Sequence, residues 1–276
     1  MKKGIALIAL LVAAVTATYA ERVLEESFDY VPGETLDGKG EWSSSTGRKL
    51  DITKDSLKLK YGKLMTAGHK VSIDCDVNAN SGVYTKTFAP ITLSAAGDTV
   101  YFSFLMNVRN TGSDDASIKI DLGAISVAAT SNDESPRGIY PKTIVSGPTV
   151  PMADGTHLIV GKFLRDSFDV QYGQLFLWVD PDPSSFGKNE PGEANSRTKN
   201  KPLGSDTWSI ETLSLSLDGY FMTGSPGKYT ADLDLDEFRI GTTWADVTPL
   251  PVKTGRKYLS LGALILVLAC VAKKQN

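Results

Sequence analysis

The chain has 276 residues, of which 41% are hydrophobic and 22% charged, and its formal charge is −3. Seven of its 29 basic residues lie in two apolar ends, and all 32 acidic residues lie between them, so residues 21–252 hold 22 bases against 32 acids, a charge of −10. This acidity argues against nucleic acid and against an anionic membrane surface as partners, and it suits a neutral or cationic ligand or bound calcium.

Residues 1–20 have the pattern of a secretory signal peptide. Two lysines precede an apolar run from Ile5 to Val15, and small residues end the segment at Ala20. We therefore expect cleavage after Ala20 and export of the remaining chain. Only two cysteines are present, Cys75 in the acidic region and Cys270 in the C-terminal apolar run, so the sequence predicts no disulfide framework.

Residues 21–248 are rich in short alternating runs bounded by Gly, Pro, Asn, Asp and Ser, which is typical of antiparallel β-structure. The clearest predicted strands lie at 98–108, 116–129, 156–164, 173–179 and 208–218. Those at 156–164 and 173–179 are apolar on both faces, which predicts burial from two sides. In 208–218 the alternation changes register near Glu211 and Thr212. With no long helical period between the ends, we expect one all-β domain, an antiparallel sandwich or jelly roll, over 21–248.

Two stretches lack an apolar pattern and are predicted as loops, 131–141 and 180–201. Loops as long as 180–201 are often functional. It opens with Asp180-Pro181-Asp182-Pro183, which is either a rigid turn with proline fixing φ, or a source of calcium ligands, or the rim of a groove.

The sharpest local pattern is Asp232-Leu233-Asp234-Leu235-Asp236-Glu237. In a strand, Asp232, Asp234 and Asp236 share one face. Apolar residues continue on the Asp parity beyond Glu237, which predicts a β-bulge near Asp236 and Glu237.

Three interpretations of this acidic strand stay open. It is a solvated acidic face with Asp236 bonded into the fold; or a calcium site in which Asp29, from a first strand beside the last one, joins Asp234 and Asp236; or a catalytic set. Glycoside hydrolases that retain configuration place two carboxyl groups about 5–5.5 Å apart, and Asp232, Asp234 and Asp236 are the candidates for such a pair. We favour no catalytic residue, because Asp stands where such hydrolases carry Glu.

Aromatic rings that stack on apolar sugar faces are the candidate ligand-binding residues. We select Phe176 and Trp178, which share one face of a strand, together with Trp208 and Tyr220; core packing is the alternative for each tryptophan, including Trp42 and Trp244. His69 and His157 are the only histidines, and the sequence shows no zinc-binding cluster, nucleophile elbow or phosphate-binding glycine loop.

The C-terminus predicts a tether. A linker at 249–257 precedes an apolar helix at 258–272 and a basic tail at 273–276. At about 1.5 Å per residue the helix would span roughly 22 Å of a roughly 30 Å hydrocarbon layer, lengthened by snorkelling lysines. Linker residues Leu250–Gly255 resemble the sortase signal Leu-Pro-x-Thr-Gly with one residue more, so the tail is either a transmembrane anchor or a sorting signal, with the domain outside the cytoplasmic membrane.

Several segments together resemble exported bacterial concanavalin A-like (laminin-G-like) domains. They are Glu25–Tyr30 with the glycines and Trp42 that follow, 156–162, 175–182 and 235–244. The resemblance implies a jelly-roll sandwich and binding of carbohydrate or protein at the cell surface. We therefore expect a non-catalytic module of the cell envelope that binds a polysaccharide or surface glycan through its concave sheet and the two loops. A glycoside hydrolase and a structural envelope or matrix protein are the alternatives.

Overall fold

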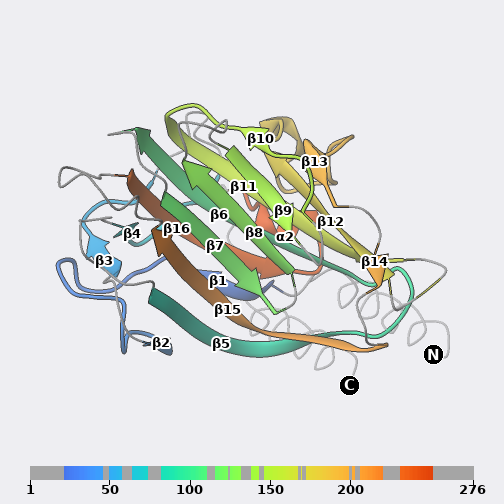
Figure 1. Ribbon diagram of the computed structural model, residues 1–276, viewed down its shortest axis with the longest axis horizontal. Helices are drawn as coiled ribbons and strands as arrows, with labels where there is room; N and C mark the ends of the chain where they lie inside the picture. The colour runs from blue at the N-terminus through green and yellow to red at the C-terminus, as the bar shows by residue number, and fades with distance from the viewer. Residues whose placement is uncertain are drawn as a thin grey trace, which may run out of the picture.

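The computed structural model describes residues 22–45, 50–57, 64–73, 82–110, 116–123, 125–131, 138–142, 146–166, 169, 172–198, 201–202, 206–219 and 231–250. Two β-sheets are stacked face to face with every pairing antiparallel (Figure 1), which confirms the predicted all-β sandwich. The signal peptide, the C-terminal helix and tail, and Tyr220 lie outside the described residues. Among the described residues, no helix is long and apolar enough to cross a membrane.

One sheet has nine strands. In spatial order the main path is β13 (Ser196–Arg197), β12 (Tyr172–Val179), β11 (Gly155–Arg165), β6 (Thr99–Asn110), β16 (Ala231–Gly241), β4 (Lys70–Ile73) and β3 (Leu50–Thr53). β1 (Arg22–Glu26) also pairs with β16, and β14 (Lys201–Pro202) pairs with β12. The first and last strands of the domain are therefore neighbours, as the sequence predicted.

The other sheet has seven strands, in the order β10 (Val150–Pro151), β9 (Gly138–Lys142), β8 (Ile125–Ser131), β7 (Ala116–Leu122), β15 (Trp208–Gly219), β5 (Gly82–Leu93) and β2 (Trp42–Ser44). The alternating run 116–129 is two strands, β7 and β8, separated by a turn in which Gly123 has a φ of +65°. The loop predicted at 131–141 is shorter in the structure, because residues from 138 onward pair with β8 as β9 and bury Ile139 in the core.

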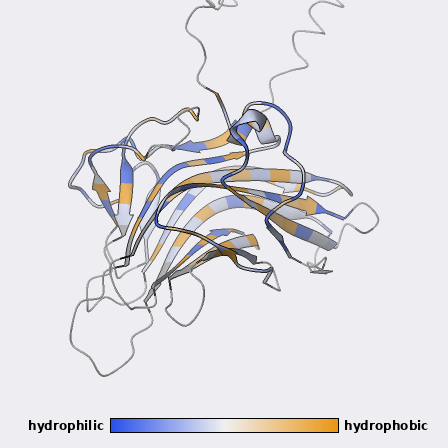
Figure 2. Cartoon of the chain, turned by 90° about the horizontal axis from the view of Figure 1, so that it is seen from above, coloured by the Kyte–Doolittle hydropathy of each residue, from blue (hydrophilic) through white to orange (hydrophobic). Residues whose placement is uncertain are grey.

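Alternating side chains of both sheets meet in the main core, where Phe104 and Phe238 stack with ring centroids 5.1 Å apart. The hydropathy colouring in Figure 2 shows the same alternation along the strands. The register change predicted near Glu211 is confirmed, since the pairing of β15 with β5 shifts between Ile210 and Thr212.

A second apolar cluster lies on the outer face of the nine-stranded sheet. Leu105, Leu158, Val160 and Trp178 project from its strands, and they are covered by Leu57, Leu64, Phe186, Trp244 and Val247. Phe186 follows the short 3-10 helix η1 (Pro183–Ser185), and Trp244 and Val247 belong to helix α2 (Trp244–Val247), which Figure 2 shows outside the sheet. This cover explains why β11 and β12 are apolar on both faces, as predicted.

The predicted β-bulge is confirmed in β16. The pairing of β16 with β6 shifts register between Asp236 and Arg239, and Glu237 takes a left-handed φ of +56°. The bulge moves Phe238 and Ile240 to the core side, while Asp234 and Asp236 stay on the outer face.

Candidate functional site

The acidic strand is buried under the outer cover of the nine-stranded sheet. Asp234 has no exposed surface, and its carboxylate accepts hydrogen bonds from Lys70 Nζ at 2.8 Å, Ser72 Oγ at 2.5 Å and Asn107 Nδ2 at 3.3 Å. A buried carboxylate is costly unless it is paired and hydrogen-bonded, and Asp234 satisfies both conditions with groups of the protein itself.

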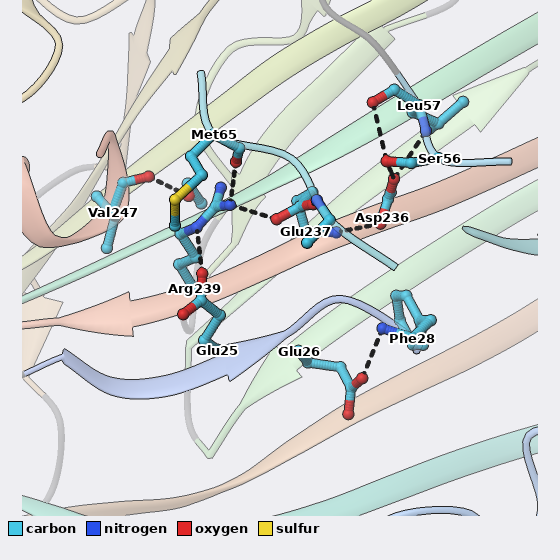
Figure 3. Close-up of polar contacts among 12 residues, drawn as sticks. Glu25, Glu26, Phe28, Ser56, Leu57, Met65, Asp236, Glu237, Arg239 and Val247 are labelled. Carbon is cyan, nitrogen blue, oxygen red and sulfur yellow. Dashed lines mark hydrogen bonds and ion pairs between the residues drawn. The ribbon is translucent and has the colours of Figure 1, made fainter. Parts of the chain in front are cut away.

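Asp236 is equally buried and fixes a neighbouring segment. It accepts hydrogen bonds from Ser56 Oγ at 2.7 Å, from the backbone N–H of Leu57 at 2.7 Å and from that of Glu237 at 2.8 Å (Figure 3). Burial raises the pKa of Asp236 to about 7, against the opposing effect of these donors.

Glu237 and Arg239 continue this polar network. Arg239 forms a buried ion pair with Glu237 and reaches Glu25 at 3.4 Å, and it donates to the backbone carbonyl of Met65 (Figure 3). Glu237 also accepts from the backbone N–H of Ala67. The bulge of β16 thereby anchors two covering segments, residues 54–57 and 64–67, onto the sheet, which supports the interpretation of Asp236 as bonded into the fold.

The structure does not bring the expected calcium ligands together. Asp29 is exposed and lies beside His69 in a separate hollow, while the carboxylates of Asp234 and Asp236 hold their own donors. Within the described ranges no group of three or more His, Cys, Asp or Glu residues is placed to hold a metal ion. The calcium site stays a prediction.

The burial of these residues also argues against the hydrolase alternative at Asp234 and Asp236. Asp234 and Asp236 have no exposed surface, so a polysaccharide cannot contact them in this conformation. The side chain of Asp232 lies outside the described part of the chain.

A different site lies at the other end of the same outer face. Phe176 and Trp178, side by side on β12, line a hollow of about 350 Å³. Its remaining walls are Pro148, Lys162, Glu190, Gly192, Glu193, Ala194, Asn195, Ser196 and Arg197. We call this set of residues the aromatic pocket; most of its rim comes from the 180–201 loop.

The aromatic side of the pocket is built from stacked rings and a fixed cation. The rings of Phe176 and Trp178 are 6.3 Å apart at 26°, and Lys162 Nζ lies 5.0 Å from the centre of the Phe176 ring. Glu190 holds Lys162 through both oxygens, at 2.8 and 2.9 Å, and accepts a third hydrogen bond from Tyr101 at 2.7 Å. These contacts attach the loop to β6 and β11.

The opposite wall carries polar groups. Arg197, on β13, is paired in register with Phe176, so both side chains stand on the same face. Asn195 uses its Oδ1 to accept the N–H of Val179 at 2.8 Å. Trp178 is 4% exposed, and its buried indole N–H has no hydrogen-bond acceptor in the described part of the structure. Because this N–H has almost no accessible surface, a ligand in the hollow cannot reach it in this conformation.

The other aromatic candidates pack inside the protein. Trp208 stacks on Phe163 at 5.1 Å and 17° against the main core, so it does not join Phe176 and Trp178. Trp42 is buried, with its indole N–H donated to Glu26 at 3.1 Å. Trp244 is buried edge-to-face against Trp178 at 5.3 Å, as part of the cover.

The Asp-Pro-Asp-Pro turn has a structural role at the start of this loop. Asp180, with a left-handed φ of +50°, accepts from the backbone of Leu158 at 3.0 Å and bonds His157 Nδ1 at 2.7 Å. Asp182 caps η1 by accepting the N–H of Ser184 at 2.8 Å.

Sequence reasoning missed Lys162, Glu190, Asn195 and Arg197 as individual residues. The only available signal was the length of the 180–201 loop, which contains three of them. Lys162 carried no signal, because it is a single charged residue inside a mainly apolar strand and is followed by Phe163 and Leu164.

No protein-family model and no curated protein matches the chain. Among solved structures, it is similar to a β-1,3-glucanase from Mycobacterium marinum, with 13% identity, a TM-score of 0.46, and coverage of 81% of this chain and 100% of that one. It is also similar to a glycosyl hydrolase family protein from Mycobacterium fortuitum, with 14% identity, a TM-score of 0.47, and coverage of 80% of this chain and 99% of that one. A third similar structure is an alginate lyase from Aplysia kurodai, with 10% identity, a TM-score of 0.45, and coverage of 81% of this chain and 100% of that one. Similarity of this degree says nothing about activity.

Proposed function

We propose that the protein is a non-catalytic carbohydrate-binding module of the cell envelope, and that the aromatic pocket is its binding site. The observation that carries the proposal is the composition of the hollow: the half-buried ring of Phe176 beside the exposed side chains of Arg197 and Asn195. Sugars present apolar C–H faces and polar edges, so a site for them combines a ring with hydrogen-bonding groups.

The polar rim supplies the second half of such a site. Arg197, Asn195 and Glu193 are all exposed at the hollow and carry groups that can bind sugar hydroxyls. A volume of about 350 Å³ lies within the range of small-molecule sites, roughly 300–1,000 Å³, so the pocket suits a short stretch of a glycan.

The expected location adds support. A signal peptide at 1–20 and a tether at 258–272 would place an acidic domain outside the cytoplasmic membrane, where polysaccharides and surface glycans are the abundant partners.

A glycan array probed with the full chain, purified in detergent, tests the proposal. The wild type should bind a defined subset of glycans, and Phe176→Ala should weaken that binding about 5- to 10-fold, because the stacking face is lost. Tyr140→Ala is the matched control. Tyr140 is a half-buried aromatic residue on β9 of the other sheet, so its removal should leave binding within about twofold.

The outcomes separate the alternatives. Binding abolished by Tyr140→Ala but not by Phe176→Ala would move the site to the seven-stranded sheet. Release of reducing ends from the bound glycans would show that the module is a hydrolase. No binding to any glycan, together with self-association of the purified chain, would favour a structural envelope protein.

A further inference from the structure

We infer that the aromatic pocket selects a sugar carrying a carboxylate, a uronic acid, which Arg197 binds with the help of Asn195. This inference rests on the proposed function and names its ligand class. The hydrogen-bonding groups around the hollow fall into two sets, those that already have a partner in the protein and those that do not.

The main acceptor of the pocket is already occupied. Both oxygens of Glu190 accept from Lys162, and one of them also accepts from Tyr101. The same ion pair neutralises the charge of Lys162, so Lys162 offers no free cation to a ligand. The Ser196 hydroxyl is likewise used, as a donor to the carbonyl of Pro148 at 2.5 Å.

The unused groups are mostly donors. Arg197 is exposed and has no acceptor in the described part of the structure. Asn195 presents its Nδ2 because its Oδ1 is fixed by the N–H of Val179. A ligand that presents several acceptor oxygens would satisfy these donors.

A carboxylate fits this set better than a hydroxyl. The guanidinium of Arg197 can bind a carboxylate through two parallel N–H···O bonds, and such charge-assisted pairs are shorter and stronger than neutral ones. Glu193, exposed on the same rim, is the one carboxylate of the hollow without a partner among the described residues. It can accept a sugar hydroxyl and so orient the ring, with Phe176 against the apolar face.

The net charge of −10 on residues 21–252 opposes the approach of an acidic glycan only at long range. At 0.15 M salt the Debye length is about 8 Å, so distant carboxylates are largely screened while the contact with Arg197 is not. Short oligosaccharides at this salt concentration are therefore the appropriate probes.

Isothermal titration with matched acidic and neutral ligands tests the inference. The probes are trisaccharides of galacturonic, glucuronic and mannuronic acid, each with its uncharged methyl ester. At least one acid should bind the full chain about tenfold or more tightly than its ester. Arg197→Gln should reduce affinity for the acid to about that for the ester, and should change the ester's own affinity much less than the acid's. The exposed loop residue Lys188, which does not line the hollow, gives the control Lys188→Gln, which should leave the preference intact.

Equal affinity for acid and ester, or an Arg197→Gln variant that keeps the preference, would overturn the inference. Binding of neutral or sulfated glycans on the array with no binding of any uronate would also overturn it, while leaving the proposed function standing. Absence of binding to every glycan would remove both.

Discussion

At the scale of single residues, Asp236 is the group whose surroundings couple folding most directly to pH. Burial raises its pKa to about 7 in the folded protein, whereas an aspartic acid in an unfolded chain titrates at about 3.9. Between those values the folded state holds a proton that the unfolded state has lost. The free energy of unfolding contributed by Asp236 therefore falls as pH rises from about 4 to about 7 and is constant above that.

The expected slope is about 1 kcal/mol per pH unit, and urea unfolding of the wild type and Asp236→Asn between pH 4.5 and 8 measures it. The asparagine does not titrate, so the stability of the wild type relative to the variant should decline up to about pH 7 and stay level above it. Asp51→Asn, at an exposed position on β3, is the control and should run parallel to the wild type. Parallel curves for Asp236→Asn would contradict the prediction.

His157 gives a second residue-scale prediction. Its Nδ1 faces Asp180 at 2.7 Å and its Nε2 faces the carbonyl of Ala153 at 2.8 Å, so only the doubly protonated ring can donate to both. The hydrogen bond with Asp180 is the main cause that raises the pKa of His157. The stabilisation is complete below about pH 6.5, the unfolded pKa, and is lost as pH rises through the folded pKa.

His157→Gln should therefore destabilise the protein by up to about 1 kcal/mol at pH 6 and by less at pH 9, in urea unfolding at both pH values. The partial exposure of Asp180 keeps the effect small. If His157→Gln lowered the free energy of unfolding equally at pH 6 and pH 9, the ring would contribute to stability by packing alone.

At the scale of elements, the bulge of β16 organises the outer face of its sheet. The extra residue gives Glu237 a left-handed conformation and points three polar side chains at the covering segments 54–57 and 64–67. Arg239 is 1% exposed and Glu237 is fully buried. Breaking such a buried pair costs about 3–5 kcal/mol, because the remaining charge has neither water nor partner.

Arg239→Met keeps most of the side-chain volume and should lower the free energy of unfolding by about that amount, measured in urea. Arg22→Met is the matched control. Arg22 forms a partly exposed pair with Glu25 within β1, and its loss should cost less than about 1 kcal/mol. The double variant Arg239→Met with Glu237→Gln should recover part of the loss. If Arg239→Met were as stable as Arg22→Met, the buried pair would not contribute as expected.

The acidic strand also shows how far sequence reasoning reaches. The switch of apolar parity after Asp236 predicted the bulge, because alternation is a local property of the chain. The partners of the acids could not be predicted: Ser56, Ala67 and Lys70 lie about 165 to 180 positions away from them along the chain, and nothing local marks them. For the same reason the sequence did not point to Arg197, which lies beside Phe176 only because β13 pairs with β12.

At the scale of the whole molecule, the nine-stranded sheet is buried on both faces. Its inner face meets the seven-stranded sheet, and its outer face is covered by α2, η1 with its loop, and the covering segments. The fully apolar strands β11 and β12 implied two-sided burial. The identity of the cover could not be predicted from short segments such as α2, which has only four residues. The aromatic pocket lies where this cover gives way to the rim formed by residues 190–197.

The remaining whole-molecule question is whether the domain is held at the membrane. The apolar run 258–272, flanked by basic residues, is expected to do so, with the acidic domain outside. In a bacterial host, the full chain should therefore fractionate with membranes, and its domain should be digested by protease added to spheroplasts. Val267→Arg places a charge at the centre of the run, at a cost of about 2.5–3.5 kcal/mol, and should shift the protein toward the soluble fraction.

Val267→Ile keeps the run apolar and should behave like the wild type. The mass of the membrane-bound protein then distinguishes a retained anchor, which gives the chain from residue 21 to residue 276, from a sorting tail removed near Leu250–Gly255. A wild-type chain that is soluble and full length would contradict the tether. The aromatic pocket, whose lining residues lie between Pro148 and Arg197, would then be a proposed glycan site on a freely diffusing protein.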